Sequence, residues 1–91
     1  MSDADPIYSV YLVRCADASL YCGIAIDVAA RIAEHNNGAR GARYTRTRRP
    51  VTLAYSAPCG TRSDALKREI QIKRMPRAAK ETLIRDALIA S

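Results

Sequence analysis

The sequence predicts a single α/β domain of the α+β kind, in which helices pack on a small, mainly antiparallel sheet. Two apolar stretches near the N-terminus are separated by only four residues, and a third short apolar stretch lies in mid-chain. Helical patterns of apolar residues follow the second and the third stretch. The predicted element order is therefore β-β-α-β-α-α. Three short strands in this order cannot form a parallel sheet through one crossover alone, so the sheet is expected to be mainly antiparallel.

The first two strands are predicted at residues 7–15 and 20–26, where apolar and β-favouring residues are dense. Residues 16–19, with Asp17, form a short connection, and a hairpin is the simplest interpretation. The hairpin places Tyr11 and Tyr21 on adjacent antiparallel strands, within reach of a common ligand.

The first helix is predicted to begin after Asp27, a suitable N-cap, and to end at the Asn-Asn-Gly sequence of residues 36–38. Arg31 and His35 are four residues apart in it, so they share one face. The arginine-rich residues 39–50 that follow have a composition typical of an exposed loop.

The C-terminal half begins with a predicted strand at residues 51–55 and a turn at residues 57–60. Thr61 or Ser63 can cap a helix that runs through Arg74, and Pro76 separates it from a last amphipathic helix near the C-terminus. Three residues of the first of these helices are expected to face the core: Ala65, Leu66 and Ile70.

Length and composition are those of one ordinary soluble globular domain, predicted at residues 7–91 after a disordered segment at residues 1–6. Three cysteines without CxxC spacing, and an N-terminus without a signal peptide pattern, favour the reducing cytoplasm. We find no apolar stretch suited to a membrane, and a single histidine disfavours a structural zinc site.

The chain is strongly basic, with a formal charge of +6, a pI near 9.7 and arginine as its main cation. Arginine binds phosphate oxygens in a bidentate manner, so nucleic acid is the natural polyanionic partner, although many small basic proteins bind none. In residues 39–50, Tyr44 could stack on a base while the arginines contact phosphates, or the segment could simply be solvated. The arginines of this segment are Arg40, Arg43, Arg46, Arg48 and Arg49.

An ordered set of motifs runs from Ser9-Val10-Tyr11 through Tyr21-Cys22-Gly23 to Arg31, His35 and Glu69. It resembles the GIY-YIG nuclease domain, in particular its small standalone bacterial members, over residues 8–84. The first motif keeps the tyrosine but not the glycine, and the second keeps the tyrosine and the glycine.

The resemblance implies a three-stranded antiparallel sheet flanked by helices and a divalent-metal-dependent hydrolysis of phosphodiester bonds in DNA. The catalytic residues that it implies are Tyr11, Tyr21, Arg31, His35 and Glu69. Glu69 is the implied ligand of Mg²⁺ or Mn²⁺, ions that need few protein ligands.

Chemistry assigns a role to each residue type in this set. His35, near its unperturbed pKa, suits a proton acceptor, either directly or by relay from Tyr11 or Tyr21. Arg31 can stabilise charge on the phosphoryl oxygens. Gly23 lets substrate or backbone approach beside Tyr21, and Lys73 is a further candidate for phosphate contact.

Two functions stay open at this point. The first is an endonuclease used in DNA repair, recombination or the processing of branched or single-stranded DNA. The second is a catalytically weak or inactive module that binds nucleic acid or docks a partner protein. Many family members have an asparagine about a dozen residues beyond the glutamate, where this chain has Lys80-Glu81-Thr82. With no added recognition domain, specificity would come from the catalytic face or from a partner protein.

Overall fold

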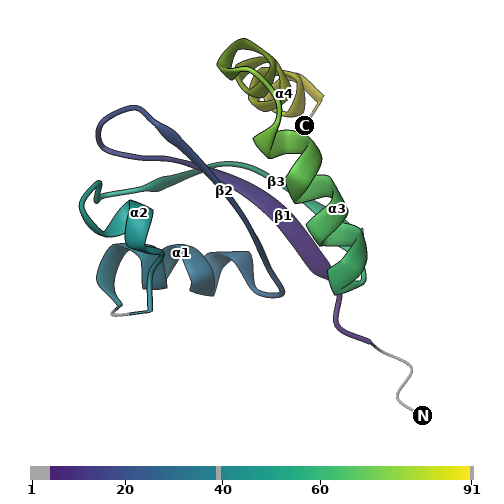
Figure 1. Cartoon of the computed structure of the whole chain (residues 1–91), viewed down its shortest axis with the longest axis horizontal. Coiled ribbons are helices and arrows are strands. Elements are labelled where there is room, and N and C mark those ends of the chain that lie inside the picture. The colour runs from purple at the N-terminus through teal and green to yellow at the C-terminus, as the bar shows by residue number, and fades with distance from the viewer. Residues whose placement is uncertain (1–4, 39, 91) are drawn as a thin grey trace.

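The computed structural model describes residues 5–38 and 40–90 and confirms the α+β class and the predicted order of elements (Figure 1). One short helix, α2, is added between the first long helix and the third strand. Four of the predicted disordered residues, 1–4, lie outside the described part, and Asp5 and Pro6 are exposed. The elements are β1 (Tyr8–Arg14), β2 (Leu20–Ala25), α1 (Val28–Asn37), α2 (Arg43–Arg46), β3 (Thr52–Gly60), α3 (Arg62–Lys73) and α4 (Arg77–Ala90).

The three strands form one antiparallel sheet in the order β2-β1-β3. The central strand β1 is the most apolar, and its residues 10–13 are all buried. In its register Tyr11 lies opposite Gly23 of β2 and Ser56 of β3. Because side chains alternate along a strand, β1 supplies a buried row to each face of the sheet.

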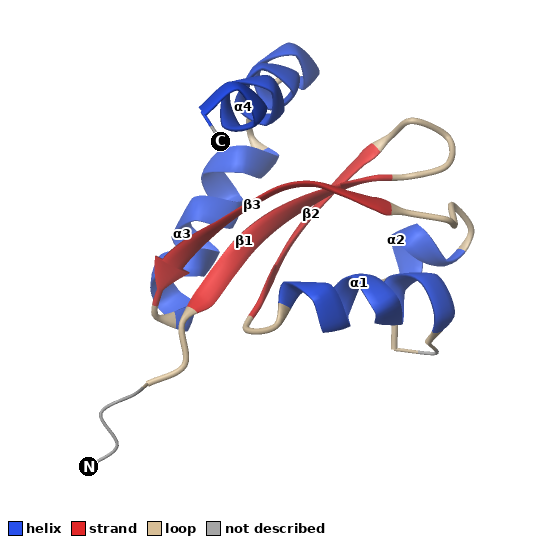
Figure 2. Ribbon diagram, turned by 180° about the vertical axis from the view of Figure 1, so that it is seen from behind, coloured by secondary structure: helices blue, strands red, loops and turns tan. Residues whose placement is uncertain are grey.

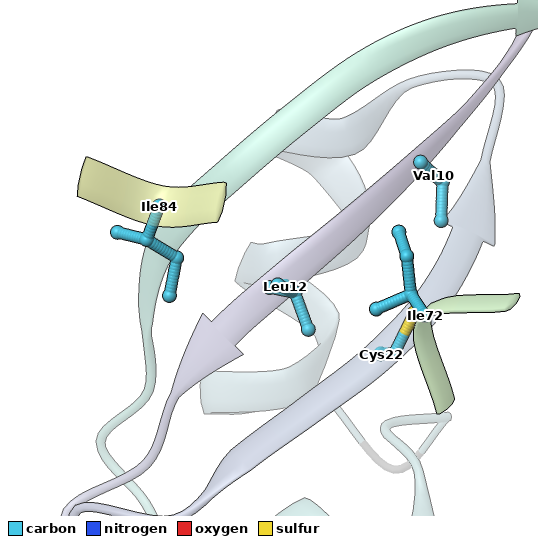
Figure 3. Close-up of a cluster of buried hydrophobic side chains, with 5 residues drawn as sticks. All are labelled: Val10, Leu12, Cys22, Ile72 and Ile84. Carbon is cyan, nitrogen blue, oxygen red and sulfur yellow. The ribbon is translucent and has the colours of Figure 1, made fainter. Parts of the chain in front are cut away.

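The two faces have separate cores. Val10 and Leu12 pack on one face with Cys22 of β2, Ile72 of α3 and Ile84 of α4 (Figure 3). The opposite face buries Tyr11, Val13, Cys15 and Val51, with Val28 and Ile32 of α1 against them. Figure 2 shows α1 and α2 on one side of the sheet and α3 and α4 on the other.

The third strand is longer than predicted. β3 continues to Gly60, so the turn predicted at residues 57–60 is wrong. Ala57 and Cys59 pack against the core cluster of Val10 and Leu12, and Pro58 is tolerated because β3 is an edge strand. Burial of alternate side chains therefore outweighs the local turn signal.

Capping side chains fix where α1 and α3 begin. For α1 the cap is Asp27, as the sequence predicted, and its carboxylate accepts a hydrogen bond from the Ala30 amide. Of the two candidates for α3, Thr61 is the cap. Its hydroxyl accepts from the Asp64 amide, while the Asp64 carboxylate accepts from the Thr61 amide.

An ion-pair network joins α4 to the β1–β2 hairpin. Arg14 donates to both carboxylate oxygens of Glu81 at 2.8 Å, and Arg77 donates to Glu81 and to the Ala18 carbonyl. The hydrogen bonds from Arg14, then those from Arg77, lower the pKa of Glu81 to about 2. Glu81, in the stretch where the family asparagine was expected, is thus a structural residue in this chain.

No helix within residues 5–38 and 40–90 is long and apolar enough to cross a membrane.

One core prediction for α3 is wrong. Ala65 and Ile72 are fully buried, whereas Ile70 is 49% exposed. Positions seven apart differ by only about 20° around an α-helix, so Ile72 lies on the same face as Ala65.

This difference gives a stability test with a matched control on the same helix. We expect Ile72→Ala to lower the free energy of unfolding by about 2–5 kcal/mol, because it leaves a cavity between β1, β2 and α3. Ile70→Ala should cost about 1 kcal/mol or less. Urea denaturation measures both, and an equal loss in the two variants would contradict the packing of this face.

Candidate active site

A hydrogen bond between Tyr11 and His35 lies at the centre of the site. Tyr11 points from β1 toward α1, and His35 lies in the last turn of α1. The Tyr11 hydroxyl is 2.8 Å from His35 Nε2, and the two residues are 1% and 0% exposed. Residues 24 positions apart in the sequence thus form one buried polar pair.

The other ring nitrogen of His35 is also bonded. Nδ1 lies 2.8 Å from the hydroxyl oxygen of Thr45 and 3.3 Å from the Ala42 amide nitrogen. Thr45 is fully buried and belongs to α2. Sequence reasoning did not assign Thr45 to the site, because a threonine among arginines gives no sign that it is buried.

The surroundings keep both members of the pair neutral near pH 7. Burial, followed by the positive charges of Arg31 and Arg49, lowers the pKa of His35, so the expectation of an unperturbed pKa is wrong. Burial raises the pKa of Tyr11 to about 12, although a hydrogen bond from Arg31 opposes this. The site therefore holds a phenol beside a neutral imidazole.

Arg31 lies beside the Tyr11 hydroxyl and reaches solvent. Its guanidinium donates to Tyr11, to Glu34 Oε1 at 3.0 Å and to the Arg40 carbonyl at 2.8 Å. Its side chain is 28% exposed, so this permanent cation lies at the boundary between the buried pair and solvent.

Tyr21 is brought to the same place by β2. Its ring meets the His35 ring edge-on, with 5.4 Å between centroids, and stacks on the Tyr44 ring at 5.7 Å. The Arg48 guanidinium in turn lies 3.9 Å from the centre of the Tyr44 ring. Tyr44 is therefore already engaged by Tyr21 and Arg48, although 38% of it is exposed.

Gly23 makes room for Tyr11. A Cβ atom at this position would lie 2.5 Å from the Tyr11 hydroxyl oxygen and 2.7 Å from Cζ. The sequence-based explanation was close approach of substrate or backbone beside Tyr21. The structure gives another reason: the cross-strand phenol of Tyr11 occupies the space.

The arginine-rich segment is not simply an exposed loop, and that prediction is wrong for part of it. Arg49 donates to the His35 carbonyl and, at 2.6 Å, to the Gly38 carbonyl at the end of α1. Arg48 pairs with Asp17 at 3.0 Å and donates to the Tyr44 carbonyl at 2.8 Å. Ala39 lies outside the described residues. The other three arginines of the segment are exposed: Arg40, Arg43 and Arg46.

Glu69 lies on the opposite face of the sheet from His35. Helix α3 holds its carboxylate 3.5 Å from the Lys73 ammonium and near Cys22, whose pKa is raised to about 11 by burial and then by Glu69. The Glu69 side chain is only 16% exposed. Its described contacts do not include the residues around His35. The structure thus gathers four of the five predicted catalytic residues and places the fifth on the other face, beside strand β2.

Glu69 is a single carboxylate, and it pairs with the Lys73 ammonium. Within the described part of the chain, no three His, Cys, Asp or Glu residues are grouped as a metal cluster would be. An ion here would have one protein carboxylate, and Mg²⁺ tolerates this because it keeps several waters and binds substrate phosphates. Glu69 would hold it.

Comparison with known proteins identifies a family match and similar chains. The family model described as the GIY-YIG catalytic domain matches residues 7–82. A UPF0213 protein of Desulfotalea psychrophila is 52% identical over 88% of this chain and 73% of its own length. A UPF0213 protein of Staphylococcus epidermidis is 52% identical over 85% of this chain and 93% of its own length.

Two solution NMR structures are also similar. A protein of E. faecalis has a TM-score of 0.63 and 33% identity, covering 98% of this chain and 93% of that one. A UPF0213 protein of Bacillus halodurans has a TM-score of 0.55 and 35% identity, covering 86% of this chain and 82% of that one. Together with the family match, these similarities show that the chain belongs to the GIY-YIG catalytic domain family.

Proposed function

We propose that the protein is a metal-dependent endonuclease that hydrolyses phosphodiester bonds in DNA. The observation that carries the proposal is the buried Tyr11–His35 pair with Arg31 on the Tyr11 hydroxyl. A neutral imidazole and a phenol can accept and relay a proton in phosphodiester hydrolysis, and a permanent cation can stabilise the charge that develops. Membership of a nuclease family supports the same reaction.

In the proposed reaction a water oxygen forms a bond to phosphorus as the bond to the 3′ oxygen breaks, and the 3′ oxygen leaves with the electron pair and takes a proton from solvent. The water proton passes to the Tyr11 oxygen as the Tyr11 proton passes to His35 Nε2, so neither side chain has to be ionised beforehand. Arg31 stabilises the negative charge that grows on the phosphoryl oxygens. Tyr21, whose ring meets the His35 ring edge-on, is the second tyrosine that could take part in this relay.

The exposure of these residues adds one requirement. Tyr11 is 1% exposed, so a water reaches its hydroxyl only after a neighbour moves. Arg31 is the neighbour that both touches Tyr11 and reaches solvent. In the proposal a substrate phosphate draws Arg31 outward, which positions the cation on the phosphate and opens Tyr11 at the same time.

Glu69 is the proposed ligand of Mg²⁺ or Mn²⁺, and the ion, when bound, supplies charge stabilisation at the leaving oxygen. Lys73 now pairs with this carboxylate. Binding of a cation at Glu69 would release the Lys73 ammonium for contact with a DNA phosphate.

The proposed partner is DNA, held through phosphate contacts of a chain with a net charge of +6. The exposed Arg40 and Arg43 are better placed for these contacts than Arg48 and Arg49, which bind backbone carbonyls. We propose a role in repair, recombination or the processing of branched or single-stranded DNA in the cytoplasm. A partner protein is proposed to supply specificity.

The metal requirement can be tested on labelled single-stranded, duplex, flap and branched DNA with Mg²⁺, Mn²⁺ or EDTA. We expect cleavage that EDTA abolishes, and we expect Glu69→Gln to lose it while DNA binding persists. Asp86→Asn on the exposed side of α4 changes the net charge equally and serves as the control.

Cleavage by Glu69→Gln at the wild-type rate would remove Glu69 from the site. Binding without cleavage by the wild-type protein under every condition would favour the binding module.

Gly23→Ala tests the packing under Tyr11. The added methyl overlaps a buried ring that cannot move freely, so we expect a loss of about 1–3 kcal/mol in the free energy of unfolding. Cleavage should fall as well, since the Tyr11–His35 bond is displaced. Urea denaturation of Gly23→Ala, Tyr11→Leu and the double variant provides the control. The cost of Gly23→Ala should shrink when the Tyr11 ring is gone, and an undiminished cost would place the conflict elsewhere.

A further inference from the structure

We propose that Thr45 is a positioning residue that holds His35 in the tautomer with its proton on Nδ1. The lone pair of Nε2 then faces the Tyr11 hydroxyl and can accept its proton. The catalytic consequence rests on the proposed function, whereas the choice of tautomer is a property of the folded protein and can be measured without any substrate.

The Thr45 hydroxyl has a single proton to donate. This oxygen lies 2.9 Å from the Ala42 carbonyl and 2.8 Å from His35 Nδ1. A carbonyl oxygen can only accept, whereas Nδ1 can donate or accept, so both contacts are hydrogen bonds at the same time only when the hydroxyl proton goes to Ala42. Toward His35 the Thr45 oxygen must therefore accept, and Nδ1 must carry the proton. In a neutral imidazole this leaves Nε2 as the acceptor for Tyr11.

The backbone amide of Ala42 favours the opposite tautomer, with the proton on Nε2. The Ala42 amide also points at Nδ1, and as a donor it would favour a lone pair there. Its nitrogen is 3.3 Å from Nδ1, beyond the usual N–H hydrogen-bond range of about 2.7–3.2 Å. The Thr45 oxygen is 0.5 Å nearer (3.3 Å against 2.8 Å), so the hydroxyl decides the tautomer.

The surroundings hold Thr45 in place and keep solvent out. Thr45 and His35 are both fully buried, so no bulk water can substitute for the hydroxyl. The Thr45 carbonyl accepts from the Arg48 amide, and the Arg49 guanidinium bonds the end of α1. Arg48 thus holds Thr45 through its backbone amide, and Arg49 holds the end of the helix that carries His35.

The tautomer matters for the proposed relay. With the proton on Nε2 instead, the ring would donate to the Tyr11 oxygen and could not accept a proton from it. The bond length could stay the same while the direction of the hydrogen bond reverses. A histidine fixed in the wrong tautomer keeps its place but loses most of its value as a base.

NMR of the ¹⁵N-labelled full chain tests the tautomer directly, and the chain has only one histidine, so its ring signals are unambiguous. We expect Nδ1 of the wild-type protein to carry the proton. In Thr45→Val, which is similar in shape, the Ala42 amide becomes the remaining partner of Nδ1, and the proton should move to Nε2. Thr45→Ser should keep the wild-type tautomer. A wild-type proton on Nε2, or an unchanged tautomer in Thr45→Val, would overturn the proposal.

Cleavage measured under single-turnover conditions supplies the second readout. Thr45→Val should lower the rate by about 10²–10⁴-fold, as for loss of a positioned proton acceptor, and Thr45→Ser should restore it to within about threefold of the wild-type rate. Thr82→Val removes a hydroxyl that also bonds a backbone carbonyl, on α4, and is the control for a remote threonine.

The outcomes separate the two proposals. Wild-type cleavage retained in Thr45→Val would overturn the role of Thr45. If the wild-type protein cleaves no DNA, the endonuclease proposal fails, and the NMR comparison still decides whether Thr45 sets the tautomer. If Thr45→Val does not fold, the wild-type and Thr45→Ser spectra still test the proposal, because a proton on Nε2 in either protein would overturn it.

Discussion

The buried imidazole of His35 is the constraint on which the rest of the site depends. Its two ring nitrogens bond the strand residue Tyr11 and the α2 residue Thr45, while the ring itself belongs to α1. A buried polar ring is stable only if these bonds are made, since each unmet one costs about 1–3 kcal/mol. Three elements are thereby fixed relative to one another, and the arginine-rich segment has to fold back to supply Thr45.

Strand β2 links this buried pair to the remote carboxylate. Gly23 leaves room for Tyr11 on one face of the strand, and its neighbour Cys22 lies near Glu69 on the other. Because β2 is at the edge of the sheet, the two faces are separated there by one strand only. In the proposed function, a phosphodiester lying across this edge could meet the relay from one side and the metal ligand from the other.

Much of the fold could be predicted because its signals are local or periodic. The hairpin, the Asp27 and Thr61 caps and the element order follow from apolar spacing and from side chains that cap their own helix. The extension of β3 to Gly60 and the burial of Ile72 in place of Ile70 depend on which faces of the strand and of α3 pack against the rest of the folded chain. Residues in the site were predicted by resemblance, but Thr45 and the structural use of Arg49 were not. Composition reveals charge, and it does not reveal that helix-end carbonyls lie within reach of that charge.

In the folded protein His35 is buried, neutral and hydrogen-bonded on both sides. NMR titration of this single histidine tests that state most directly. Because burial and the nearby Arg31 and Arg49 disfavour the charged ring, the folded pKa should lie below the ordinary value of 6.5. The unfolded chain binds the His35 proton more readily than the folded protein does. The contribution of neutral His35 to stability is therefore present above pH 6.5 and is lost as the pH falls toward the folded pKa. A titration midpoint at or above 6.5 in the folded protein would contradict the account.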